Sequence, residues 1–572
     1  MPNYELLKKK PFYLNNSQVL WVKNTLEALT LDEKIGQLFH LIMYEYEDEH
    51  LRELVHKYKI GGIMGRQMPL EDTCKAVTYL QKESEIPLLI SANFEAGGDG
   101  MIAEGTNVGP NMQIGATANP EFAAKQGYVC AREGLAVGAN YAFAPVIDID
   151  YNFRNPIVAT RAYGSDPRLV RECGVAYTKA VQEQGMAVSI KHFPGDGVDE
   201  RDQHLVTSIN SLSCDEWDAS YGEAYKACID AGALTVMIGH IMQPEYSRKL
   251  LPGIKDEDIM PATLAPELLN GLLRDKLGFN GMIITDATTM AGISIPMARD
   301  KMVPYTIAAG CDMFLFAKNL DEDYMFMTRG VKDGVISPER LDEAVMRILA
   351  TKAALKLPDK KESGALYPNT RAAKQIVGCK EHKDIELMVA DNSATLVKNL
   401  QGIIPIDINK YRRVLIYPLF TGASAYGSDG FENTQLIKEF FENEGFEVSI
   451  YKAESGYTEG RVASYKGMVD KYDLLIYISN LTTKSNQTTV RIEWAQPMGA
   501  NCPNFQIDIP TIFISFANPY HLLDAPRIRT FINAYKLKES NLKAVLDKML
   551  GRSEFKGVSP VDPFLGRWDT RL

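Results

Sequence analysis

Asp202 and His204 are two residue types that together can transfer protons. They close the polar stretch KHFPGDGVDERDQH, which spans residues 191–204. In an extended segment, residues two apart point to the same side. A carboxylate beside an imidazole can fix its tautomer and bring its pKa into the range of a general acid/base. The pair is therefore a candidate proton-transfer site, and the alternative is a solvated polar loop.

A second candidate is Asp286, which directly follows the apolar run GMIIT, residues 281–285. The small residues of the following ATTMAG leave room around this carboxylate. A carboxylate at the end of a strand is held by rigid backbone, so it could attack the anomeric carbon of a sugar or bind a metal ion. It could equally cap the helix that follows. Position alone leaves these interpretations open.

Other polar side chains also lie at the ends of apolar runs. In barrel enzymes the active site is formed at the carboxyl ends of the strands. We therefore expect these side chains to converge on one rim of a barrel. They are Asn93 with Glu95 just beyond it, Asp148 and Asp150, Lys191 and His192, and His240.

Motifs for metals and cofactors are scarce. His192, Asp202 and His204 could bind zinc only if the fold completed the ligand set, since the sequence has no H-E-x-x-H spacing. The GGDG at 97–100 precedes no Lys-Ser or Lys-Thr, so it predicts a turn and not a phosphate-binding loop. None of the eight cysteines forms a C-x-x-C pair, and we interpret them as reduced thiols. The sequence thus predicts no metal ion and no other cofactor.

Eight short apolar runs alternate with amphipathic stretches, such as the predicted helix over 166–185, in the first 355 residues or so. Nearly continuous apolar character over strand length is typical of parallel strands buried on both faces. Eight such strands alternating with helices predict an α/β fold of the (β/α)₈ TIM-barrel type, and a doubly wound open sheet is the alternative. The runs are 38–42, 61–65, 87–93, 143–150, 187–193, 234–240, 281–286 and 312–317.

The rest of the chain predicts a second, smaller domain. Residues 356–370 are charged and rich in turn formers, as in a linker. Strands at 413–419, 446–452, 473–479 and 511–517, with a helix at 433–446, predict an open parallel sheet in an α/β/α sandwich. The expected organisation is a catalytic barrel with an N-terminal extension over 1–355, a linker over 356–385, and a sandwich domain over 386–572.

The charge balance excludes some classes of partner. The 62 Lys and Arg against 73 Asp and Glu give a net charge of −11, without a long basic block. This argues against nucleic acid and membrane surfaces, which attract basic patches. No apolar run approaches the ~18 residues of a membrane span, and the N-terminus has no apolar signal region. We expect a cytoplasmic monomer or homodimer that acts on a neutral or weakly charged small molecule.

The motif KHFPGDG…DQH resembles the KHFPGHG…DSH signature of family-three glycoside hydrolases, in their β-N-acetylglucosaminidase (NagZ-type) branch. Segments along nearly the whole chain are similar to family segments, and they occur in the same order. These are LTLDEKIGQLF (29–39), NPIVATRAYGSDP (155–167), VMIGHI (236–241), GFNGMIITDATTM (278–290), KNLQGIIPI (398–406) and TIFISFANPYHLL (511–523). The last two look like the second domain of longer members.

The resemblance implies roles at matching positions. Asp286 would be the nucleophile that forms a covalent glycosyl-enzyme. His204 would be the general acid and then base, oriented by Asp202, in place of a glutamate. Independently of the resemblance, closure of the loop over the substrate could complete the site, and Gly195 and Gly197 would supply the flexible or tight backbone that such a loop needs. The residues that would bind the sugar are Arg161, Lys191, His192, Asn93 and Glu95.

The chain departs from the family pattern at two places. Asp196 stands where the family usually has histidine, and the sequence leaves its role open. The family's DQEGG-R reads NFEAGGDG here, so Asn93 replaces a sugar-binding aspartate and the nearby arginine is missing. An amide donates and accepts hydrogen bonds but carries no charge. The identity of the sugar is therefore open.

The leading hypothesis is a retaining, exo-acting β-N-acetylhexosaminidase, most simply a β-N-acetylglucosaminidase, acting on a small oligosaccharide or glycoside. One alternative is a phosphorylase or transglycosylase that uses the same residues, because a neutral histidine repels phosphate less than a carboxylate does. A second is a β-glycosidase for another sugar. A remote alternative is a non-catalytic sugar-binding protein, against which the complete set of Asp286, Asp202 and His204 argues.

Overall fold

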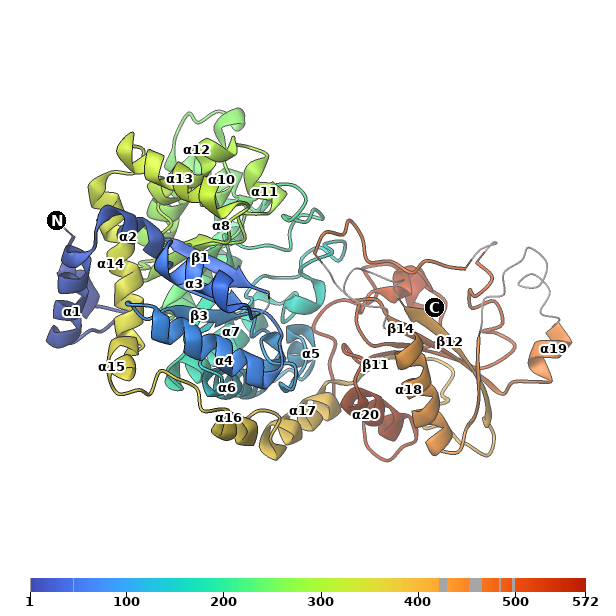
Figure 1. Ribbon diagram of the computed structural model, residues 1–572. Helices are drawn as coiled ribbons and strands as arrows, with labels where there is room; N and C mark the ends of the chain where they lie inside the picture. Colours follow the sequence, from blue (N-terminus) through green and yellow to red (C-terminus); the bar gives the residue numbers. More distant parts are fainter. Residues whose placement is uncertain (1, 45, 421–429, 452–464, 483–484, 496–498) are drawn as a thin grey trace. The chain divides into compact units, whose positions relative to one another are not determined.

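The computed structural model describes residues 2–44, 46–420, 430–451, 465–482, 485–495 and 499–572 (Figure 1). The chain forms two compact units. The first contains residues 1–108, 120–158 and 166–385, and the second contains 109–119, 159–165 and 386–572. No helix in the described ranges is both long enough and apolar enough to cross a lipid bilayer.

The first unit is built on a barrel of eight parallel strands, which confirms the predicted fold class. Neighbouring strands pair in the order β10-β1-β2-β3-β4-β5-β7-β9. The two ends of this order meet, because Thr285 donates its N–H to the Met313 carbonyl at 3.1 Å. The strands are β1 (Phe39–Met43), β2 (Gly62–Gly65), β3 (Leu89–Ala92), β4 (Tyr141–Ala142), β5 (Ala187–Phe193), β7 (Thr235–Ile238), β9 (Met282–Thr285) and β10 (Phe314–Leu315).

Helices lie around these strands (Figure 1). The amphipathic stretch predicted over 166–185 forms α7 (Pro167–Glu183), whose N-cap Asp166 accepts a hydrogen bond from the Arg168 N–H. The main helices of the unit are α1 (Asn16–Ala28), α2 (Leu31–Gln37), α3 (Asp48–His56), α4 (Leu70–Glu83), α6 (Glu121–Ala136), α9 (Glu223–Asp230), α10 (Pro244–Leu250), η7 (Glu267–Lys276), α12 (Arg299–Ala309), α13 (Leu320–Lys332) and α14 (Pro338–Ala354). The segment 356–385 contains α15 (Leu357–Glu362), α16 (Thr370–Ile376) and the start of α17 (Lys380–Ser393).

The fourth strand is shorter and earlier than the predicted run 143–150. The regular ladder ends at Ala142, since Pro145 has no N–H to donate. The chain beyond it still follows β5, because Ile147 donates its N–H to the Lys191 carbonyl at 2.9 Å. Residues 146–150 are therefore buried beside the carboxyl end of β5, although they are not a regular strand.

A buried cluster of charged side chains stabilises the barrel where the two ends of its strand order meet. Asp312 precedes β10 and accepts a hydrogen bond from the Ile283 N–H of β9 at 2.9 Å. Its carboxylate also accepts from Arg274 at 2.8 Å and from Arg340 at 2.7 Å. The two arginines lower the pKa of Asp312 although burial opposes this effect. The carboxylate therefore ties η7 and α14 to the last two strands.

Removing one partner from this cluster should be costly. We expect Asp312→Ala to lower the free energy of unfolding by about 3–5 kcal/mol, because the largely buried Arg274 loses its carboxylate partner and Arg340 keeps only Glu343. Urea unfolding followed by circular dichroism measures the change. The control is Asp333→Ala, which removes an exposed carboxylate. A loss for Asp312→Ala that equals the control would contradict the role of the cluster.

The second unit contains a six-stranded sheet in the order β11-β16-β15-β14-β12-β13. The strands are β11 (Thr395–Asn399), β12 (Arg413–Phe420), β13 (Glu447–Ile450), β14 (Leu474–Asn480), β15 (Thr511–Ser515) and β16 (Thr530–Asn533). The four predicted strands are present, although residue 452 of the predicted 446–452 lies outside the described residues. The sheet is mixed and not wholly parallel, because β11 pairs antiparallel with β16. Neither the edge strand β11 nor its neighbour β16 was recognised in the sequence.

Alternating side chains of this sheet bury two cores. Val414 and Ile416 of β12 face one core, which also contains Ile437 of α18 (Gly430–Asn443) and Leu542 of α20 (Glu539–Met549). The neighbouring residues of β12 face a second core, with Met468 of α19 (Tyr465–Val469). The alternation places apolar layers on both faces of the sheet, as expected for an α/β/α sandwich. This agrees with the predicted class of the domain.

Candidate active site

Asp286 lies at the carboxyl end of β9, at the position predicted from the sequence. Its N–H donates to the Ile238 carbonyl of β7 at 2.8 Å, and its Oδ1 accepts from the Ala287 N–H at 2.7 Å. Burial alone would raise its pKa, but nearby histidines, first of all His192, hold the pKa of Asp286 below its ordinary value. The side chain is 13% exposed. Asp286 is thus a fixed, ionised carboxylate that a small molecule can reach.

His192 faces Asp286 from the end of β5. Its Nε2 is 3.8 Å from Asp286 Oδ2. Its ring Nδ1 contacts Asp148 Oδ2 at 2.6 Å, and its backbone N–H donates to Asp148 Oδ1 at 3.1 Å. The buried Asp148 carboxylate therefore fixes the imidazole so that Nε2 points to the same space as Asp286. Asp148 was noted only as a polar residue at the end of a run, and the structure shows that it orients His192.

Lys191, Glu95 and Asn93 form a second group, and contact one another directly. Lys191 Nζ lies 2.8 Å from Glu95 Oε1 and 3.3 Å from Asn93 Oδ1. The lysine side chain is 3% exposed and the glutamate 18%. These three residues from the ends of β3 and β5 present a buried cation, a carboxylate and an amide, which can bind hydroxyl groups. The structure thus brings together three of the predicted sugar-binding residues.

Asp202 and His204 form the predicted pair. His204 Nδ1 contacts Asp202 Oδ1 at 2.7 Å, and the same oxygen accepts the His204 N–H at 2.9 Å. The Asp202 side chain is fully buried, while His204 is 26% exposed. Asp202 therefore holds the Nδ1–H tautomer, so that Nε2 can exchange a proton with a ligand. This geometry favours the proton-transfer interpretation over a solvated loop.

The loop that carries this pair is attached to the segment after Asp286. Ala291 donates its N–H to the His204 carbonyl at 3.1 Å, and Gly292 donates to the Gln203 carbonyl at 3.2 Å. The His240 N–H donates to Gln203 Oε1 at 2.7 Å. A Cβ on Gly239 would lie 3.1 Å from this Oε1 and 3.2 Å from the Cβ of His192. Gln203 thus links the loop that carries Asp202 and His204, called the dyad loop below, to the ends of β5 and β7.

The first half of the loop is buried and hydrogen-bonded, in agreement with the tight-backbone alternative at its two glycines. Residues 193–197 are buried. Trp217 Nε1 donates to the Pro194 carbonyl at 2.7 Å, and Asn210 Nδ2 donates to the Gly195 carbonyl at 3.0 Å. Gly195 and Gly197 have φ of +116° and +102°, and a Cβ on Gly197 would lie 2.0 Å from the Ile149 carbonyl oxygen. The glycines therefore serve a tight turn, and the more exposed part of the loop is 198–201.

Asp196 is a buried carboxyl in the middle of this network. Its Oδ1 accepts from Asn155 Nδ2 at 3.1 Å and from the Gly197 N–H at 2.7 Å, and its Oδ2 is 3.3 Å from Gln203 Nε2. Its own N–H donates to Asp148 Oδ1 at 2.8 Å. Burial and the neighbouring Asp148 raise the pKa of Asp196 to about 8. Asp196 therefore connects the residues behind His192 to the dyad loop, which explains its place in the motif.

The raised pKa of Asp196 predicts a pH-dependent stability. The unfolded chain releases this proton near pH 4, whereas the folded protein keeps it up to about pH 8. The contribution of Asp196 to the free energy of unfolding is therefore largest below pH 4. It falls as the pH rises to 8, by at most about 1.4 kcal/mol per pH unit. Asp196→Asn removes the titrating group, so we expect a flatter decrease between pH 5 and 8. Melting temperatures of both proteins in the same buffers test this, and equal slopes would contradict it.

His240 also lies at the end of β7, beside Asp286. Its Nδ1 contacts Thr263 Oγ1 at 3.1 Å and its Nε2 contacts the Ala287 carbonyl at 3.0 Å. Burial lowers the pKa of His240. The neutral ring therefore donates from Nε2 to the carbonyl and supports the backbone after Asp286. Sequence reasoning missed Gln203, Asn155 and Thr263, and the only signal for Gln203 is its position between Asp202 and His204.

Arg161 is the one predicted sugar-binding residue that belongs to the second unit. It ends the short helix η3 (Ala159–Arg161). Its carbonyl accepts a hydrogen bond at 2.8 Å from Asn111 of α5 (Asn111–Ala116), which also belongs to this unit. The segments 109–119 and 159–165 are loops between barrel elements in sequence, yet they pack with the second unit. The role of Arg161 therefore stays a prediction.

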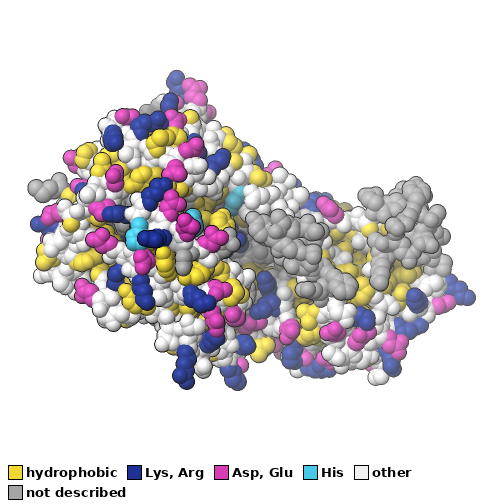
Figure 2. Space-filling view, in the orientation of Figure 1, with side chains coloured by type: hydrophobic (Ala, Val, Ile, Leu, Met, Phe, Trp, Pro, Cys, Tyr) yellow, Lys and Arg dark blue, Asp and Glu magenta, His cyan; other side chains and the backbone are white. Residues whose placement is uncertain are grey.

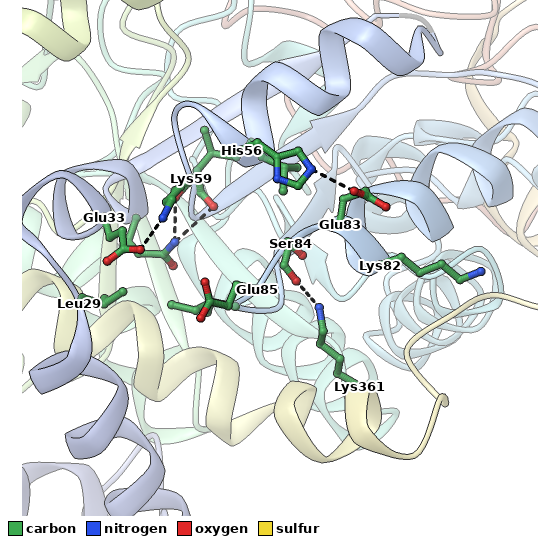
Figure 3. A pocket seen from close by; sticks show the side chains of 13 residues that line it. Leu29, Glu33, His56, Lys59, Lys82, Glu83, Ser84, Glu85 and Lys361 are labelled. Atoms are coloured by element: carbon green, nitrogen blue, oxygen red, sulfur yellow. Dashed lines mark hydrogen bonds and ion pairs between the residues drawn. The ribbon is translucent and has the colours of Figure 1, made fainter.

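A cavity of about 540 Å³ lies at the opposite end of the barrel (Figure 3). Its lining residues Lys59 and Ile60 precede β2, and Glu85 precedes β3, so it opens at the amino ends of these strands. Figure 3 shows three basic side chains of this cavity with partners: Lys59 contacts Glu33 at 2.5 Å, His56 contacts Glu83 at 2.9 Å, and Lys361 donates to the Ser84 carbonyl. These groups are engaged by the protein itself, and the cavity is separate from the cluster around Asp286.

The face of the first unit seen in Figure 2 carries acidic and basic side chains that are interspersed. Such a mixed surface produces no extended field of one sign. By contrast, Asp286, His192 and Lys191 have defined partners at the carboxyl ends of the strands. This arrangement is suited to a small polar ligand whose hydroxyls are bound and whose reacting carbon is attacked by a carboxylate.

Comparison with known proteins connects this arrangement to an enzyme family. Residues 30–351 match the family described as "Glycosyl hydrolase family 3 N terminal domain". A "Beta-N-acetylglucosaminidase/beta-glucosidase" of Cellulomonas fimi is 48% identical over 569 residues, which cover 99% of this chain and 100% of the relative. A "Beta-hexosaminidase A" of Pseudoalteromonas piscicida is 28% identical over 397 residues, or 64% of each chain.

Solved structures show the same fold. The structure of "Beta-glucoside phosphorylase BglX" has a TM-score of 0.92 and is 41% identical, over 99% of this chain and 100% of that one. The same phosphorylase bound to 2FGlc has a TM-score of 0.93. A glycoside hydrolase family 3 β-N-acetylglucosaminidase from Paenibacillus sp. str. FPU-7 has a TM-score of 0.76 at 23% identity, and it shows the likeness of fold alone.

Proposed function

Because the chain belongs to glycosyl hydrolase family 3, we propose that it cleaves the terminal β-glycosidic bond of N-acetylglucosaminides and glucosides with retention of configuration. The single observation that carries the mechanism is the contact between His204 Nδ1 and the buried Asp202 at 2.7 Å, in a loop attached to the segment after Asp286. It supports a histidine as the acid/base of the reaction. Asp286 supplies the nucleophile.

The reaction takes two steps. In the first, Asp286 attacks the anomeric carbon, while imidazolium His204 transfers its Nε2 proton to the leaving oxygen. A covalent glycosyl ester forms, and the aglycone leaves as an alcohol. In the second, the now neutral His204 accepts a proton from water at Nε2, the water oxygen attacks the anomeric carbon, and the bond to Asp286 breaks. Asp202 accepts the Nδ1–H throughout and stabilises the imidazolium.

The low pKa of Asp286 suits its role. A nucleophile must be ionised when the substrate arrives, and nearby histidines, His192 above all, favour the carboxylate form against the effect of burial. His192 Nε2, 3.8 Å from Asp286 Oδ2, can also form a hydrogen bond with a sugar hydroxyl between them. Lys191, Glu95 and Asn93 bind further hydroxyls of the same sugar ring.

The choice of sugar rests on the relatives. The protein that matches this chain over its full length is named for both N-acetylglucosaminides and glucosides. A panel of aryl β-glycosides of GlcNAc, GalNAc, glucose, galactose and xylose, with the α-anomers as controls, tests this. We expect cleavage of the β-GlcNAc and β-glucose substrates, and a β-configured first product in a proton NMR time course. An α-configured first product would contradict the double displacement.

A second candidate is phosphorolysis, in which inorganic phosphate replaces water in the second step. Two arguments favour it. The proposed acid/base is a histidine, which in its neutral form does not repel phosphate. The solved structure that covers 99% of this chain at 41% identity is a β-glucoside phosphorylase. The phosphate oxygen would attack the anomeric carbon, so that the product is a sugar 1-phosphate.

Rates with and without phosphate separate the two acceptors. Phosphorolysis predicts that kcat rises with phosphate concentration and that sugar 1-phosphate is the main product by ³¹P NMR. Hydrolysis predicts free sugar and no dependence on phosphate, with sulfate at the same ionic strength as the control. In either case the same first step at Asp286 is required, so neither outcome affects the proposed nucleophile.

A further inference from the structure

Three side chains that can ligate a metal ion meet at the start of α17, outside the active site. They are Cys379, Glu381 and His382, and one ligand atom from each lies within 4.8 Å of the other two. His382 is buried, Cys379 is partly exposed and Glu381 is exposed. A thiol, an imidazole and a carboxylate form a ligand set that suits Zn²⁺ and similar ions better than Ca²⁺ or Mg²⁺.

A buried carboxylate orients the imidazole of this cluster. Glu133 of α6 has a fully buried side chain, and its Oε1 lies 2.7 Å from His382 Nδ1. The same carboxylate accepts from the Thr106 N–H at 2.8 Å, the Thr106 hydroxyl at 2.7 Å and the Gly378 N–H at 2.9 Å. Because three other donors already point at the Glu133 carboxylate, it also accepts the Nδ1–H of His382. His382 is thereby the tautomer whose lone pair is on Nε2.

This carboxylate–histidine pair is the arrangement that accompanies histidine ligands in metal sites. Tyr128 packs the edge of its ring against His382, with centroids 6.1 Å apart at 89°. The imidazole is thus held from two sides, while the carboxylate of Glu381 is exposed and can turn toward an ion.

We propose that Cys379 Sγ, His382 Nε2 and the Glu381 carboxylate bind one Zn²⁺, with water as the fourth ligand. Zn–S and Zn–N bonds of about 2.3 and 2.0 Å in a tetrahedron place ligand atoms about 3.3–3.8 Å apart. One ligand atom from each of the three side chains already lies within 4.8 Å of the other two, and binding would draw them together. The ion would link the start of α17 to α6 through Glu133. The proposal is independent of the glycosidase activity.

Binding of Zn²⁺ and of its spectroscopic substitute Co²⁺ tests the proposal on the full chain, reduced with a phosphine. Zn²⁺ should remain at one equivalent per chain after desalting, measured by elemental mass spectrometry. Co²⁺ should give a thiolate charge-transfer band in the near ultraviolet. Cys379→Ser should abolish this band and weaken Zn²⁺ binding at least tenfold, and Glu381→Gln should weaken it while the band remains.

The matched control is Cys214→Ser, which replaces another partly exposed cysteine that belongs to none of the ligand clusters found among the described residues. It should bind both ions as the parent does. Substoichiometric Zn²⁺ in the reduced parent would overturn the proposal, and so would a Co²⁺ band that persists in Cys379→Ser. All three substituted residues, Cys379, Glu381 and Cys214, are partly or fully exposed. Circular dichroism should therefore show that every variant is folded.

Discussion

Asp286→Asn lowers kcat/KM for aryl β-glycosides by at least about 10³-fold, if this carboxylate forms the covalent intermediate. An amide has nearly the same shape but is a far weaker nucleophile. The hydrogen bond from the Ala287 N–H at 2.7 Å can be kept by the amide oxygen. The loss should therefore be kinetic and not structural, with an unchanged melting temperature to within a few degrees. Initial rates with the β-GlcNAc and β-glucose substrates measure it.

The covalent intermediate gives a second readout of the same prediction. A 2-fluoro sugar with a good leaving group should add one glycosyl mass to the parent protein, and peptide mapping should locate it on Asp286. Asp286→Asn should not be labelled. The matched control is Asp275→Asn, the same change at an exposed position of η7, which should be labelled as the parent is. A label on another residue would refute the assignment.

His204→Ala is expected to lower kcat/KM by about 10²–10⁴-fold for substrates with poor leaving groups, because these need a proton on the departing oxygen. A dinitrophenolate needs none, so its release should be nearly normal and the second step should become limiting. Azide, which attacks without giving up a proton, should then restore turnover and yield the glycosyl azide. Steady-state rates across a series of leaving groups show the expected dependence.

The companion variant is Asp202→Asn. It leaves His204 in place but removes the carboxylate at 2.7 Å from Nδ1, so it should show an intermediate loss, with the same dependence on leaving group. The control is His56→Ala in α3, an exposed histidine that lines the cavity at the amino ends of the strands. A leaving-group dependence equal to that of the parent in His204→Ala would contradict the dyad and require another acid.

The order of strands and helices could be predicted from the sequence because it depends on local patterns of apolar residues. Buried parallel strands require continuous apolar runs, and eight of them alternate with amphipathic helices, so the barrel was predictable without any contact. The same pattern located Asp286, Lys191 and His192, because the residue after a buried strand lies on the carboxyl-end rim whatever the loops do. The pairing of Asp202 with His204 was predictable from their spacing of two residues.

The antiparallel edge strand β11 and its partner β16 were not predicted, because the prediction depended on long apolar runs and these two strands lack them. Thr395–Asn399 contains Lys398 and Asn399, and only three of its five residues have apolar or threonine side chains. An edge strand is stabilised by backbone pairing on one side, so it needs less apolar sequence. The short β4 was misplaced because Pro145 interrupts a run that is apolar by composition.

The sequence by itself thus determined the barrel, the sandwich and the set of polar residues at the strand ends. Only the tertiary structure decided which of them work together. Asp148 orients His192 across 44 positions of the chain, and Asp196 reaches Asn155 across 41. Arg161 packs with the second unit although barrel elements flank it. Such contacts depend on how loops cross in space, and hydrogen bonds between distant residues leave no periodic trace in the sequence.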